Sequence, residues 1–198
     1  CLGTPNIGAI GSSGYSCYLP RTCGTAASIG DFPIVDASET HADRYNNAEW
    51  VPPEVLVVWG NEPLASNADG YVGHWLVQCV QMGTKIISID PRFTDTARLA
   101  DYHIQLRPGS DGALFMAWMH VIINEDLYDH EFVDAWTYGF DKLKEAVQAY
   151  PPEKVAEICW VSADKIVEAA RIFATCLGAW PPTPSAATRG RPTAPRHA

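Results

Sequence analysis

The feature that most constrains the fold is a run of five apolar residues at 55–59 (VLVVW), followed directly by a turn at residues 60–63 (GNEP). A continuous apolar run rich in β-branched valine is typical of a strand that is buried on both faces of a sheet. The Gly-Asn pair favours a tight turn, because both residues tolerate a positive φ. A helix is predicted over residues 71–82. Strand, glycine turn and helix together are the half-unit of nucleotide-binding α/β domains.

The same pattern continues along the chain. A second strand is predicted at residues 85–90, a short helix at 94–100 and a third strand at 103–106. After a turn at residues 108–111, Ser110 or Asp111 is expected to cap a helix over 113–123. Alternating strands and helices of this length predict a parallel sheet with right-handed crossovers. The predicted class is therefore α/β: a parallel sheet with flanking helices, a Rossmann-like nucleotide-binding layer.

Composition divides the chain into four regions. Residues 1–50 are rich in Gly, Ser and Thr without sustained periodicity, and we expect them to line a site. Residues 51–124 form the α/β part, and residues 125–177 a helical extension of the same domain. Four helices are predicted in that extension, over residues 129–136, 140–149, 153–158 and 162–174. Residues 178–198 are rich in proline and arginine, so a disordered tail is expected there.

Charge and motifs exclude several classes of protein. The formal net charge of −9 argues against a nucleic acid or an anionic membrane as the main partner. No run reaches the roughly 18 apolar residues that a membrane span needs. The sequence lacks a phosphate-binding P-loop motif and a G-x-G-x-x-G turn after a strand, which argues against the commoner nucleotide enzymes. None of the six cysteines forms a C-x-x-C pair, so a zinc ribbon is not expected.

Polar residues follow each of the three predicted strands, and parallel topology brings the strand ends to one edge of the sheet, where α/β folds bind ligands. A glycine backbone and arginine side chains suit phosphates, and threonines offer hydroxyl groups. Carboxylates can accept hydrogen bonds from ribose, in the case of Asp90, or from a guanine edge, in the case of Asp111. The candidate cofactor-binding residues are Gly60, Asn61, Glu62, Asp90, Pro91, Arg92, Thr94, Thr96, Arg107, Gly109 and Asp111. The alternative is that Asp90 and Asp111 cap helices while Arg92 forms a surface ion pair.

Four segments carry a resemblance to a known family. They are residues 59–63 (WGNEP), 89–97 (IDPRFTDTA), 100–114 (ADYHIQLRPGSDGAL) and 124–133 (NEDLYDHEFV). In order and spacing the set resembles the molybdopterin-guanine-dinucleotide oxidoreductases of the dimethyl sulfoxide reductase superfamily, over roughly residues 3–175. The resemblance implies that these loops hold the guanosine and pyrophosphate of one of two pterin cofactors on a molybdenum or tungsten atom.

The resemblance also gives a meaning to the N-terminal region. Residues 3–6 (GTPN) followed by 17–21 (CYLPR) are similar to the segment that supplies the metal ligand in this family. By that match Cys17 is the thiolate ligand of the molybdenum or tungsten and the catalytic residue, and Arg21 approaches the pterin or a phosphate. A thiolate suits such a soft, sulfur-rich site. Two alternatives remain: an inert loop cysteine, or a disulfide between Cys17 and Cys23.

The family implies anaerobic redox chemistry, by oxygen-atom or hydrogen transfer, on a small-molecule substrate. It also implies an iron–sulfur electron-transfer subunit as partner, and a prokaryotic location, either cytoplasmic or exported across the cytoplasmic membrane. Family members are several times longer than 198 residues. We therefore expect an incomplete domain: a fragment of a catalytic subunit that lacks the N-terminal iron–sulfur motif and is not active alone.

The first three residues suggest an interior cut, and the abrupt tail suggests a reading-frame change or an artificial end. Two other functions remain open from the sequence. One is a non-catalytic remnant that at most binds guanine nucleotide, and the other is a different α/β nucleotide enzyme that uses the same edge of the sheet.

Overall fold

The computed structural model describes residues 19–31, 51–66 and 72–176. The chain divides into two compact units, residues 1–37 and 38–198, and each is described by itself. In the first unit α1 (Leu19–Ile29) is an α-helix that ends at Gly30, whose φ of 81° suits a helix C-terminus. Residues 1–50 lack sustained periodicity, so this helix was not predicted. Proline at the second helical position favours the start of a helix, a local signal that the Gly/Ser/Thr-rich surroundings obscure.

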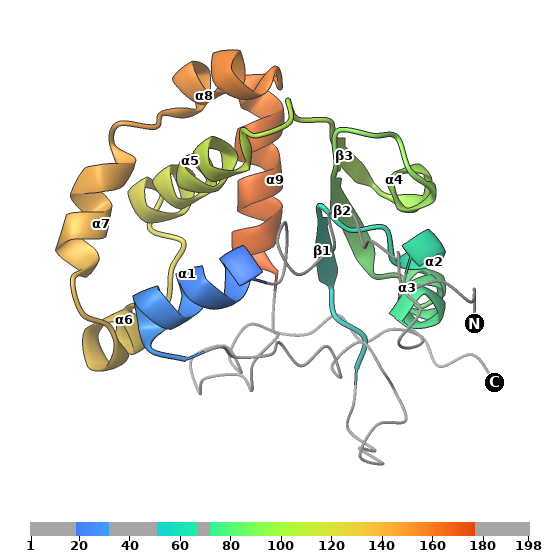
Figure 1. Cartoon of the computed structure of the whole chain (residues 1–198), viewed down its shortest axis with the longest axis horizontal. Coiled ribbons are helices and arrows are strands. Elements are labelled where there is room, and N and C mark those ends of the chain that lie inside the picture. The colour runs from blue at the N-terminus through green and yellow to red at the C-terminus, as the bar shows by residue number, and fades with distance from the viewer. Residues whose placement is uncertain (1–18, 32–50, 67–71, 177–198) are drawn as a thin grey trace, which may run out of the picture. The chain divides into compact units, whose positions relative to one another are not determined.

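The second unit is built on a three-stranded parallel sheet in the order β1-β2-β3. The strands are β1 (Val55–Trp59), β2 (Lys85–Ile89) and β3 (Tyr102–Ile104). Trp59 pairs with Ile89, and Ile89 with Ile104, so the three strands end level with one another. The loops that follow them consequently start at the same edge of the sheet (Figure 1).

Helices cover both faces of this sheet (Figure 1). On one side are α2 (Pro63–Ser66), α3 (Val72–Gln81) and α4 (Asp95–Leu99). On the other side are α5 (Asp111–Asn124), α8 (Pro152–Cys159) and α9 (Ala163–Thr175). Between α5 and α8 the chain forms α6 (His130–Trp136) and α7 (Phe140–Val147). The predicted parallel sheet with flanking helices and a helical continuation is confirmed.

Burial on both faces is found in the central strand β2, whereas β1 is partly buried at all five positions, so the prediction that residues 55–59 are buried on both faces is wrong. Ile87 and Ile89 of β2 pack in the main hydrophobic core with Leu114 of α5 and Ile166 of α9. Ile86, which points to the opposite face because side chains alternate along a strand, is also fully buried. A strand buried on both faces needs apolar residues at successive positions.

Most element ends in the second unit agree with the sequence prediction to within a few residues, but some details differ. The short helix α2 was not predicted, and β3 ends at Ile104 rather than at residue 106. Ser110 occupies the N-cap of α5, but its side chain makes no capping bond; its hydroxyl donates to the carbonyl of Arg107 at 2.6 Å instead. Within the described ranges, no helix is long and apolar enough to cross a membrane.

Two helical glycines, Gly73 of α3 and Gly112 of α5, test the close packing of α3 against α2. A Cβ on Gly73 of α3 would lie 2.5 Å from the carbonyl oxygen of Pro63, whereas a Cβ on Gly112 of α5 meets nothing within 4 Å. We expect Gly73→Ala to lower the free energy of unfolding by about 1–3 kcal/mol, because backbone must move to relieve the overlap. Gly112→Ala should raise it by about 0.4–1 kcal/mol through the unfolded state. Urea denaturation of both variants checks this, and equal effects would contradict the close packing of α2 and α3.

Candidate functional site

Two glycines open the backbone at the carboxyl edge of the sheet. The Gly60 N–H donates to the carbonyl of Ile89 at 2.8 Å, which continues the pairing of β1 with β2 to the start of the turn. Gly60 has a φ of 61° and Gly109, in the loop after β3, a φ of 82°. At both positions an added Cβ would meet no atom within 4 Å. The main chain is therefore open to a ligand at both turns, but the Gly60 N–H is already taken by the Ile89 carbonyl and is not a free donor for a phosphate.

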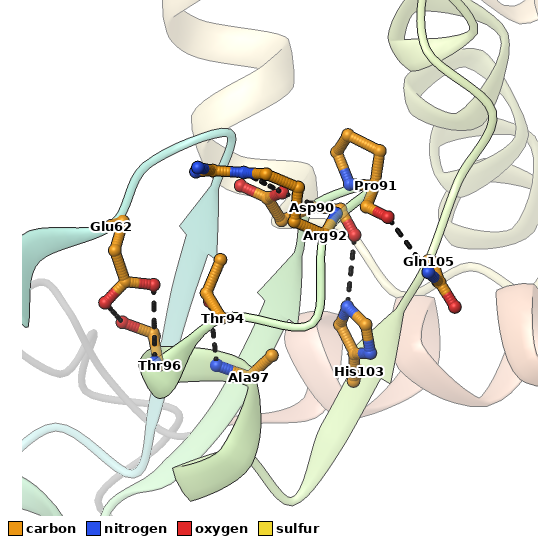
Figure 2. Close-up of polar contacts among 9 residues, drawn as sticks. All are labelled: Glu62, Asp90, Pro91, Arg92, Thr94, Thr96, Ala97, His103 and Gln105. Carbon is orange, nitrogen blue, oxygen red and sulfur yellow. Dashed lines mark hydrogen bonds and ion pairs between the residues drawn. The ribbon is translucent and has the colours of Figure 1, made fainter.

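Three loops follow the strands: the first loop is residues 60–63, the second loop residues 90–94 and the third loop residues 107–111. The second loop is held by hydrogen bonds within itself and with residues 103 and 105 (Figure 2). Asp90 is only 4% exposed, and its Oδ1 accepts from the backbone N–H of Arg92 at 2.7 Å and lies 3.4 Å from Arg92 Nε. His103 Nε2 lies 3.0 Å from the carbonyl oxygen of Asp90, and Gln105 donates to the carbonyl of Pro91 at 2.9 Å. The Arg92 side chain remains 72% exposed. The backbone N–H and the Nε of Arg92 are thus held by Asp90, while the end of its side chain faces solvent.

Glu62 joins the first loop to the second. Glu62 is 8% exposed, and its carboxylate accepts hydrogen bonds from the Thr96 hydroxyl at 2.8 Å and from the Thr96 backbone N–H at 3.3 Å. Thr94 caps α4, because its hydroxyl accepts from the N–H of Ala97 at 3.1 Å (Figure 2). Burial raises the pKa of Glu62, but hydrogen bonds from Thr94 and Thr96 outweigh burial and hold this pKa below its usual value. Thr96 is fully buried, so its hydroxyl serves this link and does not face solvent.

A tryptophan joins the first loop to the third. Trp59, the last residue of β1, donates its indole N–H to Asp111 Oδ1 at 2.8 Å. Its ring packs edge-on against Phe115 and Trp118, with centroids 6.2 and 5.6 Å apart. Asp111 itself is exposed at the start of α5. Sequence reasoning did not select Trp59 as a site residue, although it ends a predicted strand and opens the first segment that carries the family resemblance.

The remaining predicted residues lie on the outer side of the same edge. Asn61, Pro91 and Arg107 are exposed. The edge thus presents arginines from the second and third loops beside carboxylates from the same two loops. Guanidinium groups match phosphate, and carboxylates accept from N–H or hydroxyl donors. The predicted ion pair of Arg92 exists, and its partner is Asp90.

The structure gives a partial answer on the cysteines. Cys17, the predicted metal ligand, lies outside the described residues, as does Arg21's side chain. Cys23 lies on α1, exposed and with a free thiol, so the alternative of a disulfide between Cys17 and Cys23 is wrong. Among the described residues, no three His, Cys, Asp or Glu side chains lie close enough together to hold a metal ion.

Comparison with known proteins gives consistent matches. Residues 9–180 match the family model described as molybdopterin oxidoreductase. The chain is 42% identical to formate dehydrogenase H of Escherichia coli over 178 residues, which are 90% of this chain and 23% of that enzyme. It is 51% identical to the acetylene hydratase of Syntrophotalea acetylenica over 100 residues, which are 50% of this chain and 14% of that protein.

A solved structure supports the fold. The acetylene hydratase from Pelobacter acetylenicus superposes with a TM-score of 0.57 at 44% sequence identity, over 63% of this chain and 17% of that chain. The chain therefore spans less than a quarter of the length of these relatives.

The Glu62 link generates a pH-dependent prediction. Because the folded-state pKa of Glu62 lies below 4.5, its stabilisation is complete above that pH and is lost as the pH falls through the folded value. Glu62→Gln should lower the free energy of unfolding at pH 7 by about 1–3 kcal/mol, since an amide N–H₂ then faces donors on Thr96. The difference from the unmodified chain should shrink below pH 4.5. Denaturant titrations from pH 3 to 7 check this.

Glu131→Gln, at an exposed position on α6, is the matched control and should change little at any pH. A loss in Glu62→Gln that is as large at pH 3 as at pH 7 would contradict an ionised, hydrogen-bonded Glu62.

Proposed function

The chain belongs to the molybdopterin oxidoreductase family, and on this premise we propose that its carboxyl sheet edge binds the guanosine diphosphate part of a molybdopterin guanine dinucleotide. The family implies a molybdopterin-type cofactor with molybdenum or tungsten. The observation that carries the finer proposal is the level ending of three parallel strands, which gathers two open glycine turns, two arginines and two carboxylates at one edge.

The residues at this edge fit each part of the nucleotide. Arg92 and Arg107 offer guanidinium donors to the phosphates, and Gly60, which has no side chain, leaves open space for them beside the main chain. Asp90 is nearly buried, and its Oδ1 is already engaged by Arg92, which leaves Oδ2 to accept from ribose hydroxyls. Asp111 is exposed and can accept two N–H donors of a guanine edge. Adenine has no such donor pair, so the site should select guanine.

Not every predicted residue is proposed to touch the nucleotide. Glu62, Thr94 and Thr96 bond to one another or to the start of α4, and we assign them to holding the first two loops together. Trp59 is added as the residue that orients Asp111.

The wider proposal is a molybdenum or tungsten oxidoreductase that acts on a small substrate, with this chain contributing part of the cofactor site. Membership of the family and the similarity to formate dehydrogenase H support it. When bound, the cofactor supplies the redox chemistry, and the protein binds and orients it. The resemblance around Cys17 supports this residue as the thiolate ligand of the metal.

Nucleotide binding by the 198-residue chain tests the first proposal. Isothermal titration with GDP and ADP should show binding of GDP and at least tenfold weaker binding of ADP. Asp111→Asn should weaken GDP binding roughly 10- to 100-fold, because an amide offers a donor where guanine also donates. Trp59→Phe keeps the aromatic packing but removes the indole N–H, so roughly a 2- to 10-fold loss is expected. Asp134→Asn, an exposed carboxylate on α6, is the control. Equal affinity for GDP and ADP would contradict the site.

Metal content tests the assignment of Cys17. Protein purified anaerobically from a host that makes the cofactor should contain molybdenum or tungsten by elemental analysis. Cys17→Ala should lose most of it, because a thiolate ligand is gone. Cys23→Ala, which removes an exposed free thiol, should keep it. Equal metal in the two variants would contradict the role of Cys17. Protein without metal would contradict metal binding by this chain, whatever the outcome with GDP.

A further inference from the structure

Trp160 has a backbone conformation that its side chain does not favour. It ends α8 with a φ of 61° and a ψ of 31°, in the left-handed region, where glycine is the usual residue. Asp126 and Trp160 are the two non-glycine residues with positive φ in the described part of the chain. The Trp160 side chain is 74% exposed. Burial in the core therefore gives no reason for a large aromatic side chain at this position.

What Trp160 contacts is the third loop of the site. The guanidinium carbon of Arg107 lies 5.7 Å from the centroid of the Trp160 ring, within range of a cation–π interaction. Beside this contact, hydrogen bonds join the third loop to the end of α8. The N–H of Arg107 donates to the carbonyl of Cys159 at 2.9 Å, and the Cys159 thiol lies 3.5 Å from the carbonyl of Ser110. The ring and the guanidinium thus belong to two backbone segments that are already held together by these hydrogen bonds.

The two arginines of the edge are held by different chemistry. Arg92 lies against the carboxylate of Asp90, which occupies donors and offsets its charge. In the described ranges Arg107 forms no ion pair, and its contact is with a neutral ring. A contact with a neutral ring takes up no N–H donor in an ion pair and does not offset the charge of the guanidinium. Arg107 is therefore oriented without losing the donors or the charge that a phosphate would need.

We propose that Trp160 is a positioning residue that holds the Arg107 guanidinium for the phosphates of the bound nucleotide. The proposal rests on the nucleotide site proposed above and extends it to α8, a helix outside the three loops. Trp160 acts through Arg107, and its ring does not contact the nucleotide.

A double-mutant cycle on the full chain, with GDP as the probe, tests this inference. Trp160→Gly removes the ring and suits the left-handed backbone, so its melting temperature should equal or exceed that of the unmodified chain. Its affinity for GDP should fall roughly two- to fivefold, the value of an exposed cation–π contact. Trp160→Phe should restore most of the affinity. In an Arg107→Ala background, Trp160→Gly should have no further effect.

Guanosine, which has no phosphate, is the control ligand. Its affinity should be the same for Trp160→Gly as for the unmodified chain. Several results would overturn the inference. They are an unchanged GDP affinity in Trp160→Gly, a loss that persists in the Arg107→Ala background, or an equal loss with guanosine. If GDP binding responds to Asp111→Asn but not to Trp160→Gly, this inference fails and the nucleotide site stands. If the unmodified chain binds no GDP, both fail.

Discussion

The candidate site depends on the register of the parallel sheet. Trp59, Ile89 and Ile104 are paired across the three strands, so three chain segments leave the sheet at one level. That register is set by burial: β2 is covered on both faces, and a slip of one residue would exchange the side chains that face the two helical layers. The position of the polar loops is thus a consequence of apolar packing below them.

Hydrogen bonds between loops turn this proximity into a defined geometry. Glu62 reaches from the first loop to Thr96, Trp59 reaches from β1 to Asp111, and His103 lies against the carbonyl of Asp90. Each bond joins a segment to one that is distant in sequence. Glu62 and Thr96, whose polar groups could bind a ligand, bond to each other instead. A buried carboxylate and hydroxyl that satisfy each other avoid the cost of burial without a partner.

The sequence predicts the fold well and the site only in part, for physical reasons. Strands and helices follow from local apolar patterns, which is why β1 is recovered from residues 55–59 alone. The gathering of the three loops follows from parallel topology. The division of roles among loop residues does not, because the bonds of Glu62 and Trp59 span 34 and 52 residues. The role proposed for Trp160 depends on a backbone conformation that tryptophan rarely adopts, so no local pattern indicates it.

The charge distribution at the edge shows how a chain that is acidic overall could bind the anionic ligand proposed for it. The net charge of −9 acts over distances at which salt screens it, beyond about 10 Å. At contact distance the balance is set by immediate neighbours. The charge of Arg92 is partly offset by Asp90, whereas Arg107, among the described residues, faces a neutral ring. Since an uncompensated cation attracts a phosphate more strongly than a paired one, the affinity of this edge for an anion should depend more on Arg107 than on Arg92. The ring of Trp160 is neutral and does not offset the charge of Arg107.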